Sequence, residues 1–251
     1  MKTINKLKKN FKKENFHPSI FGIFRHPFYF LRADLYKSIS QLTGRLNGKL
    51  LDIGCGNKPY QDICDVNEYI GLEIDDEGNR NHSCADFFYD GKVIPFNDKA
   101  FDSVLSSEVF EHVFNPDEFL QEVNRVTKIG GYFLITAPFV WAEHEKPYDY
   151  ARYSSFGLKH ILDKHGFKAI ECKKSGNGIE LIFQLMNHYP YGVVLPNNKY
   201  MEKIFRSVIR LIRSIMRIPI NIIGLILSKA LPRNNDLYLN NIILAKKIKD
   251  T

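Results

Sequence analysis

Short apolar runs alternate with helically spaced apolar positions through the middle of the chain. A short run that stops at glycine or at an acid predicts a buried strand, and apolar residues at intervals of three and four predict a helix. The predicted strands cover residues 49–53, 68–74, 103–106, 131–137 and 167–173. The predicted helices cover residues 27–43, 116–128 and 154–165. This alternation is typical of an α/β fold, Rossmann-like and doubly wound, with a mostly parallel sheet of the seven-stranded type.

The connection after the second strand is short. Only seven residues separate Ile74 from a short run at residues 82–85, whereas a parallel crossover normally needs a dozen or more. We therefore expect residues 82–85 to form a stunted edge strand without its usual helix.

The pattern changes after residue 178. Residues 179–233 are apolar and basic with little alternation, and residues 237–245 then resemble one more strand. The simplest account is a helical insertion before the last strand of the sheet. The chain would then comprise a basic N-terminal arm (1–26), a core (27–178 with 234–248) and the helical insertion (179–233).

Composition and charge narrow the class of protein. A chain of 251 residues with 44% hydrophobic residues is not disordered and suits one α/β domain with an appendage. The net charge of +7 is concentrated in residues 2–13 and 203–217, which indicates either contact with an anionic surface or a solvated face. The four cysteines form no CxxC pair, and the N-terminus lacks the apolar segment of a secretory signal. We expect reduced thiols, a cytoplasmic protein and no metal.

The segment LLDIGCGNKPY at residues 50–60 is a candidate binding site. Gly54 and Gly56 follow a buried strand, where they allow positive φ and a close approach of the backbone to a ligand. The second strand ends at Glu73, about twenty residues later, where a carboxylate can accept both hydroxyls of a ribose. No GK[ST] follows the turn, and Pro59 replaces the last glycine of a dinucleotide motif, so triphosphates and dinucleotides are disfavoured.

With the segments that follow it, this turn resembles the class I S-adenosylmethionine (SAM)-dependent methyltransferases, type 11-like. The resembling segments, in family order, are LLDIGCG, YIGLEID, Ala85-Asp86, IPFNDKAFDSVLSSEVFEHV and GGYFLITAP, all within residues 48–175. A series in the right order is more specific than any one motif. The resemblance implies SAM as the cofactor.

The resemblance also implies which residues contact the cofactor. In that family the acid before the glycine turn neighbours the methionine part, and the acid that ends the second strand holds the ribose; here these are Asp52 and Glu73. Asp86 would read the adenine amino group with Phe87 beside the ring, and Ser106 would line the other side. Alternatively, Asp86 is a turn residue and Phe87 a core residue.

Methyl transfer needs mainly alignment of the reactants, and a hydroxyl or amine acceptor also needs a general base. Glu108 and His112 stand four residues apart, which places both on one face of a helix. This is half of a metal-site pattern without an evident third ligand. The resemblance suggests that the EH pair at 111–112 is a scaffold feature, and a helix-capping role for His112 competes with catalysis.

The segment HEKPYDYARYS at residues 144–154 crowds polar and aromatic side chains onto one loop, which indicates function. It resembles a loop of bacterial methyltransferases associated with surface-polysaccharide synthesis. His144 is the predicted base, and Asp149 is a further candidate. The predicted acceptor pocket comprises Tyr148, Arg152 and Tyr153. The alternative is a structural Asp149–Arg152 ion pair with the tyrosines packed beneath the loop.

Cations recur at intervals of three and four in residues 201–217, so they form one stripe of a basic amphipathic helix. Pro219 and the arginines interrupt the apolar run, and the apolar part of residues 219–231 is too short to span a membrane. We expect residues 201–231 to attach the protein peripherally to an anionic membrane surface on its inner face. A cap over the active site or a dimer interface is an equal alternative, and nucleic-acid binding would rest on charge alone.

The sequence thus predicts a SAM-dependent methyltransferase with a small-molecule or glycan acceptor, most specifically an O-methyltransferase of a glycan or lipid-linked saccharide in polysaccharide biosynthesis. The acceptor rests on family association alone. Two alternatives stay open, namely methylation of a small apolar or quinone-like acceptor, and a non-catalytic assembly protein that keeps the fold.

Overall fold

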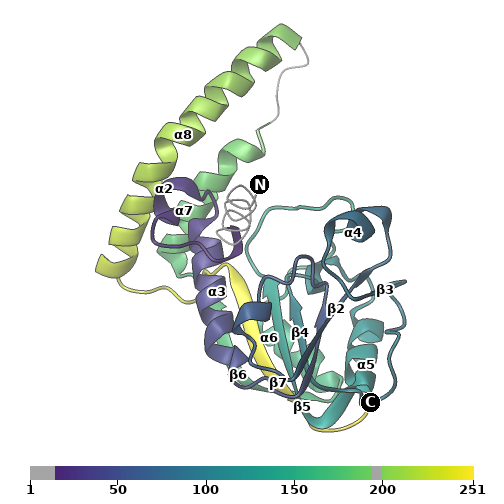
Figure 1. Ribbon diagram of the computed structural model, residues 1–251. Helices are drawn as coiled ribbons and strands as arrows, with labels where there is room; N and C mark the ends of the chain where they lie inside the picture. Colours follow the sequence, from purple (N-terminus) through teal and green to yellow (C-terminus); the bar gives the residue numbers. More distant parts are fainter. Residues whose placement is uncertain (1–14, 194–198) are drawn as a thin grey trace. The chain divides into compact units, whose positions relative to one another are not determined.

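The computed structural model describes residues 15–193 and 199–251, which divide into two compact units (Figure 1). The sheet unit comprises residues 37–174 and 240–251, and the helical unit comprises residues 175–239 and the described part of residues 1–36. The expected helical insertion lies within the helical unit, which also includes N-terminal residues that the sequence assigned to the arm and the core. Residues 1–14 of the basic arm lie outside the described residues.

One seven-stranded sheet carries the order β3–β2–β1–β4–β5–β7–β6. The strands are β1 (Lys49–Ile53), β2 (Glu68–Ile74), β3 (Phe87–Tyr89), β4 (Phe101–Ser107), β5 (Thr127–Pro138), β6 (Phe167–Ser175) and β7 (Asn240–Lys247). β7 runs antiparallel to β5, whereas the pairs from β3 to β5 are parallel. The predicted Rossmann-like α/β class with a mostly parallel, seven-stranded sheet is confirmed.

Both faces of the sheet are buried. Leu51 and Ile53 of β1 belong to a core that α5 (Pro116–Val126) and α6 (Ser155–Lys164) complete. Leu50 is fully buried too, although successive side chains of a strand point to opposite faces. A strand buried on both faces carries a continuous apolar run, which is why the strands were recognisable in the sequence.

The edge strand lies later in the chain than predicted. The chain forms a short helix, α4 (Glu77–His82), and pairs with β2 only from Phe87 onward. The side chain of Asp76 accepts the backbone N–H of Asn79 at 2.8 Å and so caps this helix. The prediction of a strand at 82–85 without a helix was wrong, because the cap starts a helix there and gives the crossover its usual length.

The helical unit contains α2 (Gly22–Arg25), the first turns of α3 (Tyr29–Thr43), α7 (Gly178–His188) and α8 (Lys199–Ala230). A capping box begins α7, because Asn177 and Glu180 each accept the other's backbone N–H. The fully buried Asn221 of α8 donates to the Ile23 carbonyl at 2.6 Å and accepts from Asn187 at 2.7 Å. One amide thereby joins α2, α7 and α8.

The long helix α8 continues through Pro219. The sequence analysis expected Pro219 to help interrupt the apolar run, but the helix is not broken there. A proline removes one helical hydrogen bond, and buried Ile220 and Asn221 hold the next turn. Residues Met201–Ala230 are long and apolar enough to cross a membrane, by length and composition. Only 18% of the most apolar window is buried.

Candidate active site

The glycine turn follows β1 at the carboxyl edge of the sheet, where ligands bind in open α/β folds. Gly54 and Gly56 have φ values of +69° and +47°. A Cβ added at Gly54 would lie 2.3 Å from Cγ2 of Val109, whereas one added at Gly56 would meet nothing within 4 Å. Gly54 is therefore required for packing beneath the turn, and Gly56 borders open space that a ligand can enter.

Glu73, near the end of β2, lies directly against this turn. Its Oε2 accepts the backbone N–H of Gly56 at 2.9 Å, and its Oε1 accepts that of Ile74 at 3.2 Å. Burial raises the pKa of Glu73 despite these two bonds. The structure thus brings together the turn and the carboxylate that the resemblance assigns to the ribose.

Asp52 is buried beneath the turn, and its Oδ2 accepts the hydroxyl of Tyr69 at 2.6 Å. Burial raises the pKa of Asp52 to about 7; the Tyr69 bond opposes this and the charge of Glu73 adds to it. A cation nearby would favour the ionised carboxylate. The sulfonium of SAM is such a cation, so the buried acid fits the predicted cofactor.

Asp86 immediately precedes β3, and its Oδ2 accepts the N–H of Gly71 at 2.7 Å and the ammonium of Lys58. Burial opposes ionisation, but these bonds lower the pKa of Asp86 overall. Phe87 is 45% exposed and packs edge-on against Phe96. The adenine role of Asp86 and Phe87 stays a prediction. Sequence reasoning missed Lys58, whose place within the glycine turn was the available signal.

Ser106 lies near the carboxyl end of β4, between Ile53 of β1 and Ile135 of β5. It is fully buried, and its hydroxyl has no hydrogen-bond partner among the described residues. Its predicted position beside the cofactor is not tested by these contacts.

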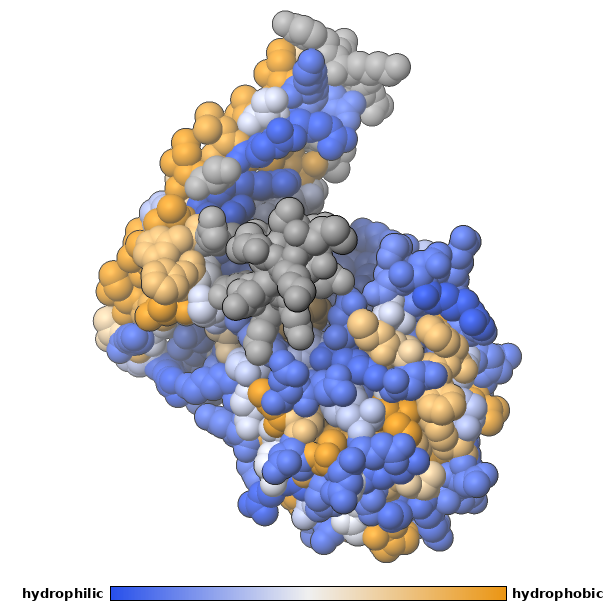
Figure 2. Space-filling view, viewed as in Figure 1, coloured by the Kyte–Doolittle hydropathy of each residue, from blue (hydrophilic) through white to orange (hydrophobic). Residues whose placement is uncertain are grey.

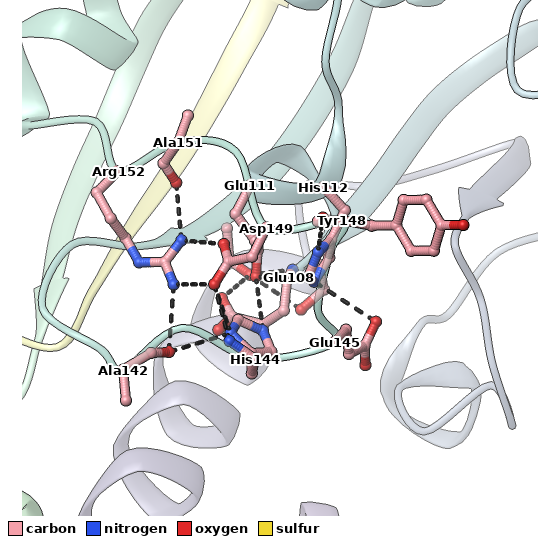
Figure 3. Close-up of polar contacts among 12 residues, drawn as sticks. Glu108, Glu111, His112, Ala142, His144, Glu145, Tyr148, Asp149, Ala151 and Arg152 are labelled. Carbon is pink, nitrogen blue, oxygen red and sulfur yellow. Dashed lines mark hydrogen bonds and ion pairs between the residues drawn. The ribbon is translucent and has the colours of Figure 1, made fainter. Parts of the chain in front are cut away.

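A second polar cluster follows β4 and β5 (Figure 3). The Glu111 carboxylate is 1% exposed, and neither of its oxygens has a hydrogen-bond partner in the part of the chain that the structure describes. Burial raises the pKa of Glu111 to about 9, and the charge of Glu108 raises it further. The Nε2 atoms of His112 and His144 each lie 3.8 Å from Oε1 of Glu111. We call these three residues the Glu-His-His cluster.

The loop after β5 holds the two histidines in place. His112 Nδ1 donates to the Tyr148 carbonyl at 2.7 Å. His144 Nδ1 faces the Ala142 carbonyl at 3.3 Å and Oδ2 of Asp149 at 3.2 Å. Both Nδ1 atoms therefore face acceptors only, which leaves each Nε2 directed at the buried carboxylate.

Asp149 is buried and binds the guanidinium of Arg152 through both carboxylate oxygens. It also accepts the backbone N–H of His144 at 2.9 Å. The Arg152 bond lowers the pKa of Asp149 to about 2. The Asp149–Arg152 ion pair, which the sequence analysis gave as an alternative, is thus present. Through Asp149 it also holds the backbone of His144 in place.

Tyr148 contacts this cluster through its backbone carbonyl, and its ring points away from the cluster (Figure 3). The Tyr148 side chain is 62% exposed. Tyr153 packs against Phe110 with ring centroids 5.2 Å apart, and its carbonyl accepts from Asn241. Their contact with an acceptor stays a prediction, as does that of Arg152.

Glu108 and His112 do not share a helix. Glu108 has a φ of +57° and accepts from the Thr136 hydroxyl at 2.8 Å, and only Phe110–His112 form a short 3-10 helix. The predicted pairing was wrong because the chain turns at Glu108. The buried carboxylate near His112 is that of Glu111. The apolar Val109 and Phe110 before it were the sequence signal of its burial.

The glycine turn and the Glu-His-His cluster are linked by Glu145. Its Oε2 lies 3.7 Å from Nε2 of His112, and its charge contributes, after burial, to the raised pKa of Glu73. Both groups of residues lie at the carboxyl edge of the sheet, where ligands of open α/β folds bind.

Comparison with known proteins agrees with this geometry. Residues 51–135 match the family described as "Methyltransferase domain". The chain is 33% identical over 117 residues to a fatty-acid O-methyltransferase of Mycolicibacterium smegmatis, covering 41% of each chain. It is 32% identical over 152 residues to an uncharacterized methyltransferase of Mycolicibacterium gilvum, covering 55% of this chain and 54% of that one. The chain thus spans about half or less of the length of these relatives.

Among solved structures, a SAM-dependent methyltransferase from Archaeoglobus fulgidus superposes with a TM-score of 0.54 at 21% identity. The match covers 91% of this chain and 98% of the other. This likeness establishes the fold.

Proposed function

We propose that this chain, which carries a class I SAM-dependent methyltransferase domain over residues 51–135, transfers a methyl group to an oxygen of an amphiphilic acceptor. A lipid-linked saccharide is the first candidate. The observation that carries the proposal is the open cradle at Gly56 with Glu73 bound to it and the Glu-His-His cluster beside it.

In this proposal one group of residues binds the cofactor and a second group binds the acceptor. SAM supplies an electrophilic methyl group on a sulfonium when bound. Glu73 would hold the ribose hydroxyls, the backbone at Gly56 would approach the cofactor, and Asp52 would favour the positive charge. The acceptor would lie toward the Glu-His-His cluster, which would align it with the methyl group. Alignment of the reactants is the main contribution that an enzyme makes to a displacement reaction.

An exposed apolar face along α8 supports a membrane-associated acceptor. Figure 2 shows hydrophobic residues along one side of this helix with a hydrophilic band beside them. The exposed apolar residues include Ile204, Val208, Leu211, Ile215, Ile222 and Ile226. Their spacing of three, four and seven puts them on one face, and such a face suits the boundary of a lipid layer.

The basic stripe contributes less to this proposal than the sequence suggested. Arg213 donates to the Pro190 carbonyl at 2.6 Å and stacks on Tyr191, and Arg206 pairs with Glu202. These cations have partners in their own unit. We therefore propose peripheral attachment to the cytoplasmic face of a membrane, chiefly through the apolar face.

A fatty-acid carboxylate is the second candidate acceptor. It is favoured by the similarity to the fatty-acid O-methyltransferase of Mycolicibacterium smegmatis and by the same apolar face. A carboxylate acceptor is already ionised at neutral pH and needs no general base.

Calorimetric titration of the full chain with S-adenosylhomocysteine tests the cofactor. The wild type should bind, and the folded Gly56→Ala variant should bind at least about tenfold more weakly, because the new methyl group enters the cradle. A well-folded wild type that does not bind would exclude the enzyme and leave the assembly role.

Radiolabelled SAM incubated with the protein and a bacterial lipid extract tests the acceptor. A methyl ether on a lipid-linked saccharide would survive mild alkali and move to the aqueous phase after mild acid. A fatty-acid methyl ester would release methanol in mild alkali. Label in a lipid that resists both treatments would favour a quinone-like acceptor over the proposed one.

Co-flotation with vesicles containing anionic lipid tests the attachment. Val208→Asp combined with Ile215→Asp should abolish flotation without unfolding, because both side chains are exposed. Phe156→Asp, on α6 and 80% exposed, is the matched control. Retention of the wild type after alkaline carbonate extraction would instead indicate that α8 spans the membrane.

A further inference from the structure

The buried Glu111 carboxylate is the least satisfied polar group of the described site. Its two oxygens have no hydrogen-bond partner among the residues that the structure describes, although a buried carboxylate is costly unless it is paired, protonated or bound to a metal. Arg152, whose positive charge acts on Glu111, is already bound to Asp149. The groups that do face Glu111 are the Nε2 atoms of His112 and His144.

The two histidines present the atoms that a metal ion needs. Each Nδ1 is directed at acceptors, so in the neutral ring it carries the proton and Nε2 has a free lone pair. The rings are 4.8 Å apart between centroids and meet edge to face. Two unprotonated ring nitrogens therefore converge on one unpartnered carboxylate.

We propose that Glu111, His112 and His144 bind a divalent transition-metal ion through one carboxylate oxygen and two Nε2 atoms. The three ligand atoms lie within 4.8 Å of one another. Tetrahedral zinc with bonds of about 2.0–2.1 Å would separate them by about 3.4 Å, so small side-chain rotations close the site. Imidazole ligands favour zinc, cobalt or nickel over magnesium, which prefers oxygen ligands.

The surroundings match the outer shell of known metal sites. A metal-bound histidine commonly donates its other N–H to a carboxylate or a backbone carbonyl. His144 faces Asp149 and His112 donates to the Tyr148 carbonyl in this way (Figure 3).

Three protein ligands leave at least one coordination position open, as in catalytic rather than structural zinc sites. Resting on the proposed function, we assign that position to the acceptor oxygen. A bound metal would lower the pKa of an acceptor hydroxyl, so that the hydroxyl would release its proton to solvent before it attacks the methyl group. The general base that the sequence assigned to His144 would then not be needed. The sequence led us to expect no metal because the three ligands come from two distant segments.

Metal binding is measured on the full chain without SAM. Metal-free protein is dialysed against Co²⁺, and bound cobalt is counted and observed through its visible absorption; Zn²⁺ displacement follows. We expect one ion per chain, with a spectrum that reports nitrogen ligands, and Mg²⁺ should not displace it.

Each ligand is removed in a single variant: Glu111→Gln, His112→Gln or His144→Gln. Each variant should bind cobalt at least about a hundredfold more weakly, which exceeds the effect of losing a residue that only supports a ligand. His160→Gln removes an exposed histidine of α6 and is the matched control. Circular dichroism confirms folding of each variant. Absence of binding by the wild type, or unchanged binding in the folded variants, overturns the proposal.

The metal proposal and the methyltransferase proposal fail separately. Gly56→Ala should lose S-adenosylhomocysteine and keep cobalt, whereas His144→Gln should lose cobalt and keep S-adenosylhomocysteine. Loss of both ligands in folded His144→Gln would contradict a metal site that is distinct from the cofactor cradle.

Discussion

Two glycines of one turn should respond differently to the same substitution. Gly54 and Gly56 both have positive φ, so alanine at either position costs about 1–2 kcal/mol of backbone strain. At Gly54 the new Cβ also lies 2.3 Å from Val109, and overpacking of this kind costs about 1–3 kcal/mol more. At Gly56 no protein atom lies within 4 Å of the new Cβ.

The free energy of unfolding should therefore fall by about 1–2 kcal/mol in Gly56→Ala and by about 2–5 kcal/mol in Gly54→Ala. Urea denaturation measures both values, and an unchanged slope with denaturant confirms that the variants are comparable. Titration with S-adenosylhomocysteine is then made on the folded fraction. Gly56→Ala should lose affinity despite its small loss of stability.

Two results would refute this reasoning. Equal loss of stability in the two variants would mean that Val109 moves aside freely and that the turn is not packed against it. Unimpaired binding by folded Gly56→Ala would mean that the open space beside this residue is not the cofactor cradle.

Three further predictions concern stability. Folding raises the pKa of Asp52 to about 7, so the folded chain binds this proton more tightly and the free energy of unfolding falls as pH rises from about 4 to 7. Asp52→Asn lacks this titrating group, so above pH 7 it should be more stable than wild type, on the order of 3–4 kcal/mol. Thermal melts of both proteins at pH 5 and pH 8 measure the difference in stability. An equal difference at the two pH values would contradict the prediction. Asn177→Ala removes the cap of α7 and should cost about 1 kcal/mol in urea, while the exposed Phe156→Ala should cost almost nothing. Arg152→Met leaves buried Asp149 without its partner and should cost about 3 kcal/mol; a stability equal to wild type would show that the pair does not hold the loop.

Most of the sheet could be predicted because its strands are buried on both faces. Runs such as residues 49–53 and 131–137 are mostly apolar, and their alternation with helices leaves few possible topologies. The edge strand was misplaced because β3 has only three residues. So short a strand has no periodicity of its own, and the capping bond from Asp76 decided where the helix before it begins.

The cofactor part of the site was predictable for a related reason. Asp52 and Glu73 lie near the carboxyl ends of β1 and β2, and Gly54 follows β1 directly. The carboxyl ends of parallel strands meet at one edge of the sheet. Lys58 was missed because its partner Asp86 is far along the chain, and only the tertiary structure brings the two together.

The sequence by itself determined the α/β class, the glycine turn and the kind of cofactor, because these depend on local patterns and on strand order. Tertiary structure alone decided which carboxylate meets the two histidines. Glu111, His112 and His144 come from a short turn after β4 and from the loop after β5, two segments that no spacing rule connects. Their convergence depends on how the chain turns at Glu108 and on the Asp149–Arg152 pair that fixes the loop.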